Sequence, residues 1–245
     1  HFGCRATLVR VVEGGDESEN PADKKLLERK DDFAKTPKGE LIARGELEKD
    51  ETKKAGLARI RNEEFVLPNK TKIPPQLALS GTNPNYTKAR EYQINCQRCV
   101  PTYEMRRRGY DVEALGNYDK RLGSLNSIRK MWGVKSDEIF RNYRKNESGE
   151  LENLNIAYFK EYLKNIENGE RHQIGWLWGE QNGHTILVER KSGVLNFIDP
   201  QTNKVRNFKE FQDWTKTSNG IFWAFRIDDR ELDKNMIKLI MKGRS

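Results

Sequence analysis

The sequence has only three cysteines and three histidines in 245 residues. An odd and small number of cysteines cannot form the disulfide framework that stabilises many small secreted domains. Cys96 and Cys99 have the spacing of half a zinc site. No second Cys-x-x-Cys or His pair exists to complete the four ligands of a structural zinc. We therefore expect no disulfide framework, no metal site and no cofactor.

Long apolar runs are also missing. Hydrophobic residues make up 35% of the chain and charged residues 33%, so much of the chain must face solvent. No segment approaches the ~20 apolar residues of a membrane span, which excludes an integral helical membrane protein. We find no signal-peptide pattern at the start and no internal repeat, which excludes a solenoid.

The net charge of +8 is unevenly distributed. Residues 1–60 carry equal numbers of basic and acidic side chains, so the whole excess lies in residues 61–245. A basic surface is typical of proteins that meet nucleic acid or acidic protein partners. A solvated surface without a partner is the alternative, and the composition does not choose between them.

A cysteine stands where an irregular stretch changes to a helical pattern, in residues 95–109. Asn95 is expected to cap this helix through its side chain, and Gly109 is expected to end it. A thiol at a helix N-terminus faces unpaired N–H groups and the positive end of the helix dipole, which favours the thiolate. Cys96 is therefore a candidate nucleophile.

The other candidate groups lie far downstream, in residues 183–201. The pattern predicts two strands joined by a turn at Lys191-Ser192-Gly193. If the turn centres between Lys191 and Ser192, His184 and Asp199 are direct cross-strand partners on one face of the hairpin. A histidine oriented by a carboxylate is what a cysteine nucleophile needs.

Two alternatives stay open for the nucleophile. Pro101 has no N–H for the carbonyl of Gln97, so either the first helical turn is distorted or the regular helix begins nearer Cys99. Cys99 would then be the nucleophile, and otherwise it is a core residue. His172 follows a Gly-Glu-Arg turn and is expected at the surface.

Three separated motifs now carry a resemblance: Asn95-Cys96-Gln97-Arg98-Cys99, Gly183-His184 and Asp199-Pro200-Gln201. In this order they resemble the papain-fold toxin family of glutamine deamidases, over roughly residues 80–230. The resemblance implies a Cys-His-Asp triad on Cys96, His184 and Asp199. It also implies a protein substrate, an immunity protein, and delivery to the cytoplasm of a target cell by secretion or on a virion.

Further site residues follow partly from the same likeness. The backbone N–H of Cys96 is a natural oxyanion donor, with a second from Gln93 or Asn95 by analogy with the papain fold. Gln201 could orient the imidazole, face the substrate or belong to the turn. Trp176 and Trp178 wall the cleft or pack in the core. Thiolate attack on a carboxamide would release ammonia from glutamine, whereas attack on a backbone amide would make the protein a cysteine protease.

The start of the chain suggests a context. His1-Phe2-Gly3-Cys4-Arg5 is similar to the ending of phage Mu F-like head-morphogenesis proteins, and the alternative is a truncated strand. We predict a head-protein remnant and charged helical linker over residues 1–62, and a catalytic domain over 63–245. A non-catalytic phage head or nucleic-acid-binding protein is the rival to an enzyme.

The order of expected elements gives the fold class. We predict an apolar arm over residues 65–90, helices over 125–132, 137–144, 151–166, 208–214 and 232–241, and strands over 110–114, 176–178, the hairpin and 221–227. Helices precede an antiparallel sheet that carries His184 and Asp199, which indicates an α+β fold. This order is typical of a papain-like core with the nucleophile helix packed against the sheet.

Overall fold

The computed structural model describes residues 6–7, 66–118, 122–178 and 182–244. The chain divides into one compact unit of residues 1–10 and 64–245 and a second of residues 11–63. The expectations for His1, Cys4 and the charged linker lie outside the described residues. The boundary that we expected at residue 62/63 stays a prediction, but the first unit includes the N-terminal residues, because β1 (Ala6–Thr7) pairs with β7.

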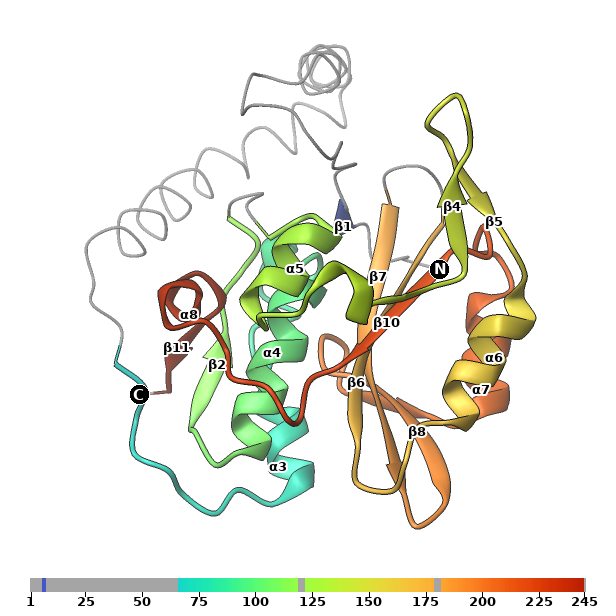
Figure 1. The fold of residues 1–245 in the computed structure, drawn as a ribbon. Coiled ribbons are helices and arrows are strands. Elements are labelled where there is room, and N and C mark those ends of the chain that lie inside the picture. The colour runs from blue at the N-terminus through green and yellow to red at the C-terminus, as the bar shows by residue number, and fades with distance from the viewer. Residues whose placement is uncertain (1–5, 8–65, 119–121, 179–181, 245) are drawn as a thin grey trace, which may run out of the picture. The chain divides into compact units, whose positions relative to one another are not determined.

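A seven-stranded antiparallel sheet is the centre of the first unit (Figure 1). Its main path runs β3-β10-β6-β7-β8-β9, and β1 pairs with the beginning of β7. The strands are β3 (Phe140–Arg141), β6 (Arg171–Leu177), β7 (Asn182–Lys191), β8 (Val194–Asp199), β9 (Lys204–Arg206) and β10 (Phe222–Arg226). β6, β7 and β10 are buried along most of their length, which places the core around them.

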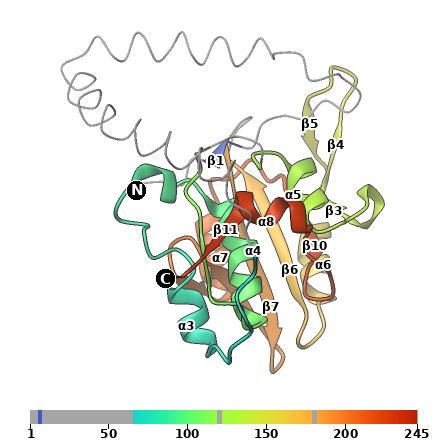
Figure 2. The same ribbon diagram turned by 90° about the vertical axis from the view of Figure 1, so that its left-hand side faces the viewer.

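Helices cover both faces of this sheet, as Figures 1 and 2 show. On one face, α6 (Ile156–Lys164) and α7 (Phe208–Thr215) pack against the even-numbered side chains of β6 and β7. On the other lie α4 (Cys96–Arg107) and α5 (Leu125–Met131). The first face is aromatic: Phe159 stacks on Phe222, and Phe211 stacks on Phe197.

The β7–β8 hairpin shows that the predicted register was wrong: the turn is centred one residue later than expected, which shifts each cross-strand pairing by two residues. Its turn is Ser192-Gly193, with both residues at positive φ and Lys191 paired with Val194. This is the two-residue hairpin turn that suits the twist of the strands. Extending the register places Asp199 opposite Ile186 and leaves His184 diagonal to it. The change moves the pairing by an even number of residues, so both side chains stay on the predicted face.

The helix that carries the candidate nucleophile begins at Cys96, as one of the two alternatives required. Pro101 lies inside it and is tolerated. At the other end, Gly109 takes a φ of 96°, and the N–H groups of Gly109 and Tyr110 bond to the carbonyls of Arg106 and Met105. This is a Schellman ending, so the predicted glycine stop is confirmed.

Two other predicted helices differ from the elements in the structure. The helix predicted over 137–144 was wrong: a short 3-10 turn (Ser136–Glu138), β3 and β4 (Tyr143–Lys145) occupy it. The helix predicted over 151–166 is shortened, because β5 (Leu151–Asn153) pairs with β4 before α6 begins. The described part of the arm contains the α-helix α3 (Pro75–Ser80), and a 3-10 helix begins at its last residue (Arg90–Tyr92). The strand β2 (Val112–Ala114), the helix α8 (Lys234–Ile240) and its partner strand β11 (Met241–Gly243) complete the unit.

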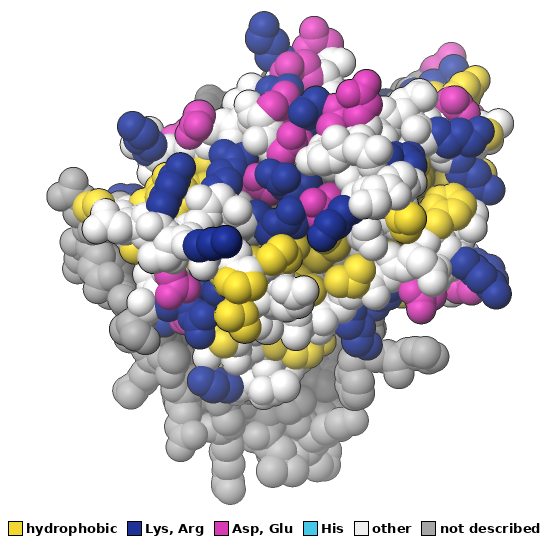
Figure 3. Space-filling view, turned by 90° about the horizontal axis from the view of Figure 1, so that it is seen from below, with side chains coloured by type: hydrophobic (Ala, Val, Ile, Leu, Met, Phe, Trp, Pro, Cys, Tyr) yellow, Lys and Arg dark blue, Asp and Glu magenta, His cyan; other side chains and the backbone are white. Residues whose placement is uncertain are grey.

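The described part of the chain is therefore α+β with antiparallel sheets, as the sequence predicted. None of its helices is long and apolar enough to cross a membrane. The face in Figure 3 has Lys and Arg side chains interspersed with Asp, Glu and apolar side chains, not gathered into one basic surface. This face lacks the continuous basic stripe that nucleic-acid binding usually requires.

Candidate functional site

His184 and Asp199 form a buried pair at the beginning of β7 and the end of β8. Nε2 of His184 lies 3.3 Å from Oδ1 of Asp199, and both side chains have 0% exposure. The predicted proximity of these two residues is therefore present, although the register that predicted it was wrong. A carboxylate at this position fixes the orientation of the imidazole and stabilises its protonated form.

The turn after β8 holds the carboxylate of Asp199 from the other side. The backbone N–H of Gln201 donates to Oδ1 at 3.1 Å, and the hydroxyl of Thr202 donates to Oδ2 at 2.7 Å. Burial raises the pKa of Asp199, but His184, Thr202 and Arg206 outweigh it and hold that pKa below its usual value. Asp199 is therefore an anion at neutral pH, although no water reaches it.

Three tryptophans surround the imidazole. The ring centroids of Trp176 and Trp214 each lie 5.3 Å from that of His184, both edge-on, and Trp178 stacks on it at 6.0 Å. Trp176 is fully buried in the aromatic core, whereas Trp178 is partly buried at its border. Arg206 lies 3.8 Å above the ring of Trp214 and 3.9 Å from Asp199. The imidazole thus lies among aromatic rings, with the anionic Asp199 beside it.

Both candidate cysteines of α4 are buried and unoxidised. The thiol of Cys96 donates to Oε1 of Gln97 at 3.7 Å. The thiol of Cys99 lies one turn further on and donates to Oδ1 of Asn95 at 3.2 Å. Cys99 is thus engaged in the packing beneath the helix terminus.

Asn95 occupies the N-cap position, but its side chain makes no cap hydrogen bond, so that prediction was wrong. Its Nδ2 instead donates to the carbonyl of Leu115 at 2.9 Å and to Oδ1 of Asn83 at 3.3 Å. Its Oδ1 accepts from Nε2 of Gln201 at 3.2 Å. The side chain is withdrawn from the helix because buried groups from three other segments satisfy it.

The side-chain amides of Asn95 and Gln201 join the start of α4 to the turn that follows β8. Gln201 belongs to the turn that holds Asp199, and Asn95 directly precedes Cys96. Asn83 adds a second connection, since its Nδ2 donates to the carbonyl of Gln201 at 3.0 Å. The contacts therefore run from the N-terminus of α4 through Gln201 to Asp199 and His184. Gln93, the other residue expected to assist, is exposed.

One buried acceptor in this group has no hydrogen-bond partner in the structure: Oε1 of Gln201. The orientation of its amide is fixed by the network. Asn95 must present its oxygen to Gln201, because its nitrogen donates to the carbonyl of Leu115. Gln201 must then donate with its nitrogen, which leaves Oε1 available. Burying an unpaired acceptor is costly, so such an atom needs an explanation.

The nucleophile helix packs against the sheet on the face opposite to the one that carries His184. Side chains of α4 contact Arg171 and Glu189, which belong to the odd-numbered set of β6 and β7. His184 and Trp176 belong to the even-numbered set, which faces α6 and α7. β8 pairs with β7 only from Leu187 onward. The N-terminus of α4 therefore reaches the His184–Asp199 pair past the end of β8.

Access to the group is restricted. Cys96 is 2% exposed and His184 is 0% exposed. Little of the thiol is therefore exposed to a substrate in this conformation. Within the described ranges, no group of three or more His, Cys, Asp or Glu residues is placed to hold a metal ion.

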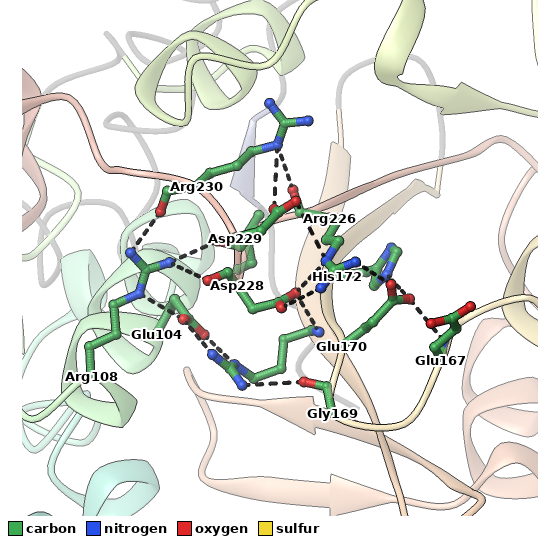
Figure 4. A network of polar contacts seen from close by, with 12 residues as sticks. Glu104, Arg108, Glu167, Gly169, Glu170, His172, Arg226, Asp228, Asp229 and Arg230 are labelled. Atoms are coloured by element: carbon green, nitrogen blue, oxygen red, sulfur yellow. Dashed lines mark hydrogen bonds and ion pairs between the residues drawn. The ribbon is translucent and has the colours of Figure 1, made fainter.

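A contrasting polar network lies at the opposite end of α4 (Figure 4). Glu104 has 0% exposure and accepts from Arg108 and, through both of its oxygens, from Arg171. The network continues through Asp228, Arg226 and Glu170 to His172. His172, which we expected at the surface, is buried in β6. Its Nδ1 lies 2.6 Å from the hydroxyl of Tyr162.

Sequence reasoning missed four residues of the site: Asn83, Thr202, Arg206 and Trp214. The sequence Asp199-Pro200-Gln201-Thr202 has proline at the second position of a β-turn, so a side chain three residues after the aspartate could have been expected near it. Asn83 left no such signal, because a buried asparagine and a loop asparagine look alike in sequence.

Comparison with known proteins adds no identification. No protein-family model matches this chain, and no curated protein sequence matches it.

Proposed function

We propose that this protein is a thiol hydrolase of carboxamides, with Cys96 as nucleophile, His184 as base and Asp199 as the group that orients it. The single observation that carries the proposal is the connection of the buried His184–Asp199 pair, through Gln201, to the residue that precedes Cys96. The three motifs that resemble the papain-fold toxin family support the same assignment, and a papain-like core is part of the proposal.

The chemistry begins with a change in the position of the thiol. Its hydrogen bond to Gln97 must break, and the sulfur must turn toward the imidazole. Because Nε2 of His184 faces Asp199, Nδ1 is the nitrogen that takes the thiol proton. The anionic Asp199 then stabilises the imidazolium that forms. The apolar tryptophan environment strengthens this interaction, because water does not screen it.

Bond formation and cleavage follow in a balanced order. The thiolate adds to the carboxamide carbon, and the resulting oxyanion is stabilised at the α4 N-terminus, where the first N–H groups have no intrahelical acceptor. The imidazolium gives its proton to the departing nitrogen, which leaves as ammonia. Water, deprotonated by His184, then attacks the thioester and restores the thiol.

A glutamine side chain is the substrate that we favour. Oε1 of Gln201 is a buried acceptor without a partner, and a primary carboxamide has two N–H groups to offer it. With the family resemblance, this supports a toxin that deamidates glutamine in a target protein and is held in check by an immunity protein. Delivery by an upstream phage head domain belongs to the same proposal.

Mass spectrometry of proteins from exposed target cells tests the proposal. Deamidation adds about one dalton per glutamine, because NH₂ is replaced by OH, whereas proteolysis produces fragments. Cys96→Ala should abolish the mass change, since no other group replaces the thiol, and Cys99→Ala should retain it. Fragments that disappear in Cys96→Ala would identify a protease. A mass change that persists in Cys96→Ala would refute the assigned nucleophile.

A further inference from the structure

Asn83 is a buried side chain that the proposed reaction does not use. It lies in the loop after α3, is 7% exposed, and makes contacts on both sides of the site. Its Nδ2 donates to the carbonyls of Tyr92 at 2.9 Å and Gln201 at 3.0 Å. Its Oδ1 accepts from Nδ2 of Asn95. Asn83 thus hydrogen-bonds to both Asn95 and Gln201.

Side-chain amides therefore connect the N-terminus of α4 to the turn after β8 in two ways. Gln201 binds Asn95 directly, and Asn83 binds both Asn95 and the backbone carbonyl of Gln201. Since α4 packs on the face of the sheet opposite His184, these contacts fix how far the helix terminus lies from Asp199. Without them, the packing of α4 against β7 would still hold the helix on the sheet, but not its terminus at the end of β8.

The backbone around Asn83 is anchored independently of its side chain. The carbonyl of Thr82 accepts from the N–H of Ala114 at 2.8 Å, and the hydroxyl of Thr82 donates to the carbonyl of Ala78. The carbonyl of Asn83 accepts from the N–H of Tyr86. Truncating the side chain thus removes the cross-link and leaves the loop attached to α3 and β2.

We propose that Asn83 is a positioning residue, which sets the nucleophile Cys96 in register with the His184–Asp199 pair. This inference rests on the proposed function. Asn83 touches neither the thiol nor the imidazole, and it acts through Asn95 and Gln201. A loss of this side chain should therefore uncouple Cys96 from His184 without removing either of them.

The coupling is measured by the rate at which iodoacetamide alkylates Cys96, followed by peptide mass spectrometry so that other cysteines do not contribute. In the parent protein at pH 7, His184→Gln should slow alkylation at least about tenfold, because the thiolate then lacks its base and counter-ion. In the Asn83→Ala background, the same His184→Gln change should alter the rate less than about twofold, because the pair is already separated.

Asn142 provides the matched control. It is also a fully buried asparagine that joins separate segments, with Nδ2 donating to the carbonyl of Gly220 at 2.8 Å and Oδ1 accepting from the N–H of Phe222 at 2.7 Å. It lies beside β3, which β10 and β6 separate from β7. Both Asn142→Ala and Asn83→Ala should lower the melting temperature, but Asn142→Ala should leave the tenfold effect of His184→Gln intact.

The outcomes separate the two proposals. If His184→Gln leaves alkylation unchanged in the parent protein, the Cys96–His184 pair itself is refuted, and the role of Asn83 with it. If the parent shows the effect and Asn83→Ala keeps it in full, Asn83 is only a structural residue and the inference fails. Should Asn83→Ala not fold, judged by circular dichroism, Asn83→Ser is used in the same cycle, because serine is too short to reach Gln201.

Discussion

The two ends of α4 are held by different chemistry. At the N-terminal end, neutral amides of Asn83, Asn95 and Gln201 connect the helix to the turn after β8, and Arg98 of the first turn binds Leu239 and Asn117. At the C-terminal end, Arg107 binds Glu189 with two hydrogen bonds, and Arg106 pairs with Asp111 while it also binds backbone carbonyls of α3. Both ends are buried, so each set of polar groups must be paired.

The helix dipole favours the arginines at the C-terminal end. Cations are favourable at a helix C-terminus, where the partial charge is negative, so arginines can anchor that end of the helix. At the N-terminus, the N–H groups carry the partial positive charge that would stabilise a thiolate or an oxyanion. Neutral amides fix that end without adding a carboxylate that would compete for the same N–H groups.

Truncation should have the largest effect, because it breaks both ends together. Deleting residues 1–90 removes Asn83 and also the α3 carbonyls that accept from Arg106, so we expect no cooperative thermal transition. Deleting residues 1–60 removes the two-residue strand β1 alone from the described sheet, and we expect a folded and active protein. Thermal melts of the two truncated proteins measure whether each deleted segment is needed for the fold. A large loss of melting temperature in the shorter deletion would place residues 1–60 within the fold.

Glu104→Gln should be the most damaging single change at the charged end. The carboxylate is fully buried between Arg108 and Arg171, and its neutralisation leaves two poorly solvated guanidinium groups without an anion. Removing one partner of a buried ion pair typically costs about 3–5 kcal/mol. Urea denaturation measures the loss. The exposed pair of Arg144 and Glu152 is the control, and Glu152→Gln should cost less than about 1 kcal/mol.

Cys99→Ala should have a smaller effect at the amide end. It removes a buried sulfur and one hydrogen bond to Asn95, which corresponds to about 1–2 kcal/mol. The remaining contacts of Asn95 still hold the helix terminus, so we expect most of the activity to remain. Chemical denaturation and the deamidation assay measure the two quantities side by side. Complete loss of activity in a folded Cys99→Ala protein would move the nucleophile by one turn.

His172 should give the smallest effect, visible in the pH dependence of stability. Burial lowers the pKa of His172 more than Glu170 and Asp228 raise it. Between its usual value of about 6.5 and its lower folded value, the unfolded chain binds a proton that the folded protein does not. Stability therefore falls as pH drops through this window. His172→Gln should flatten that slope, because the substituted side chain does not titrate. An unchanged slope between pH 7 and pH 5 would contradict this.

The sequence by itself determined which groups could do chemistry and on which kind of element each would lie. The position of Cys96 at a helix start, the glycine stop at Gly109 and the shared face of His184 and Asp199 all follow from local rules. The shared face of His184 and Asp199 was predicted correctly despite the wrong register, because side chains alternate along a strand and a shift by two residues preserves the face. The α+β class followed from the order of the elements.

Tertiary structure decided how those groups are joined. Local rules assign Asn95 to capping, but Asn83 and Gln201, which are distant in sequence, compete for its side chain and win because buried amides must be satisfied. The face of the sheet that α4 covers, the tryptophans around His184 and the burial of His172 depend on packing between segments far apart in the chain. Local periodicity contains no information about such contacts, because they form only when the sheet assembles.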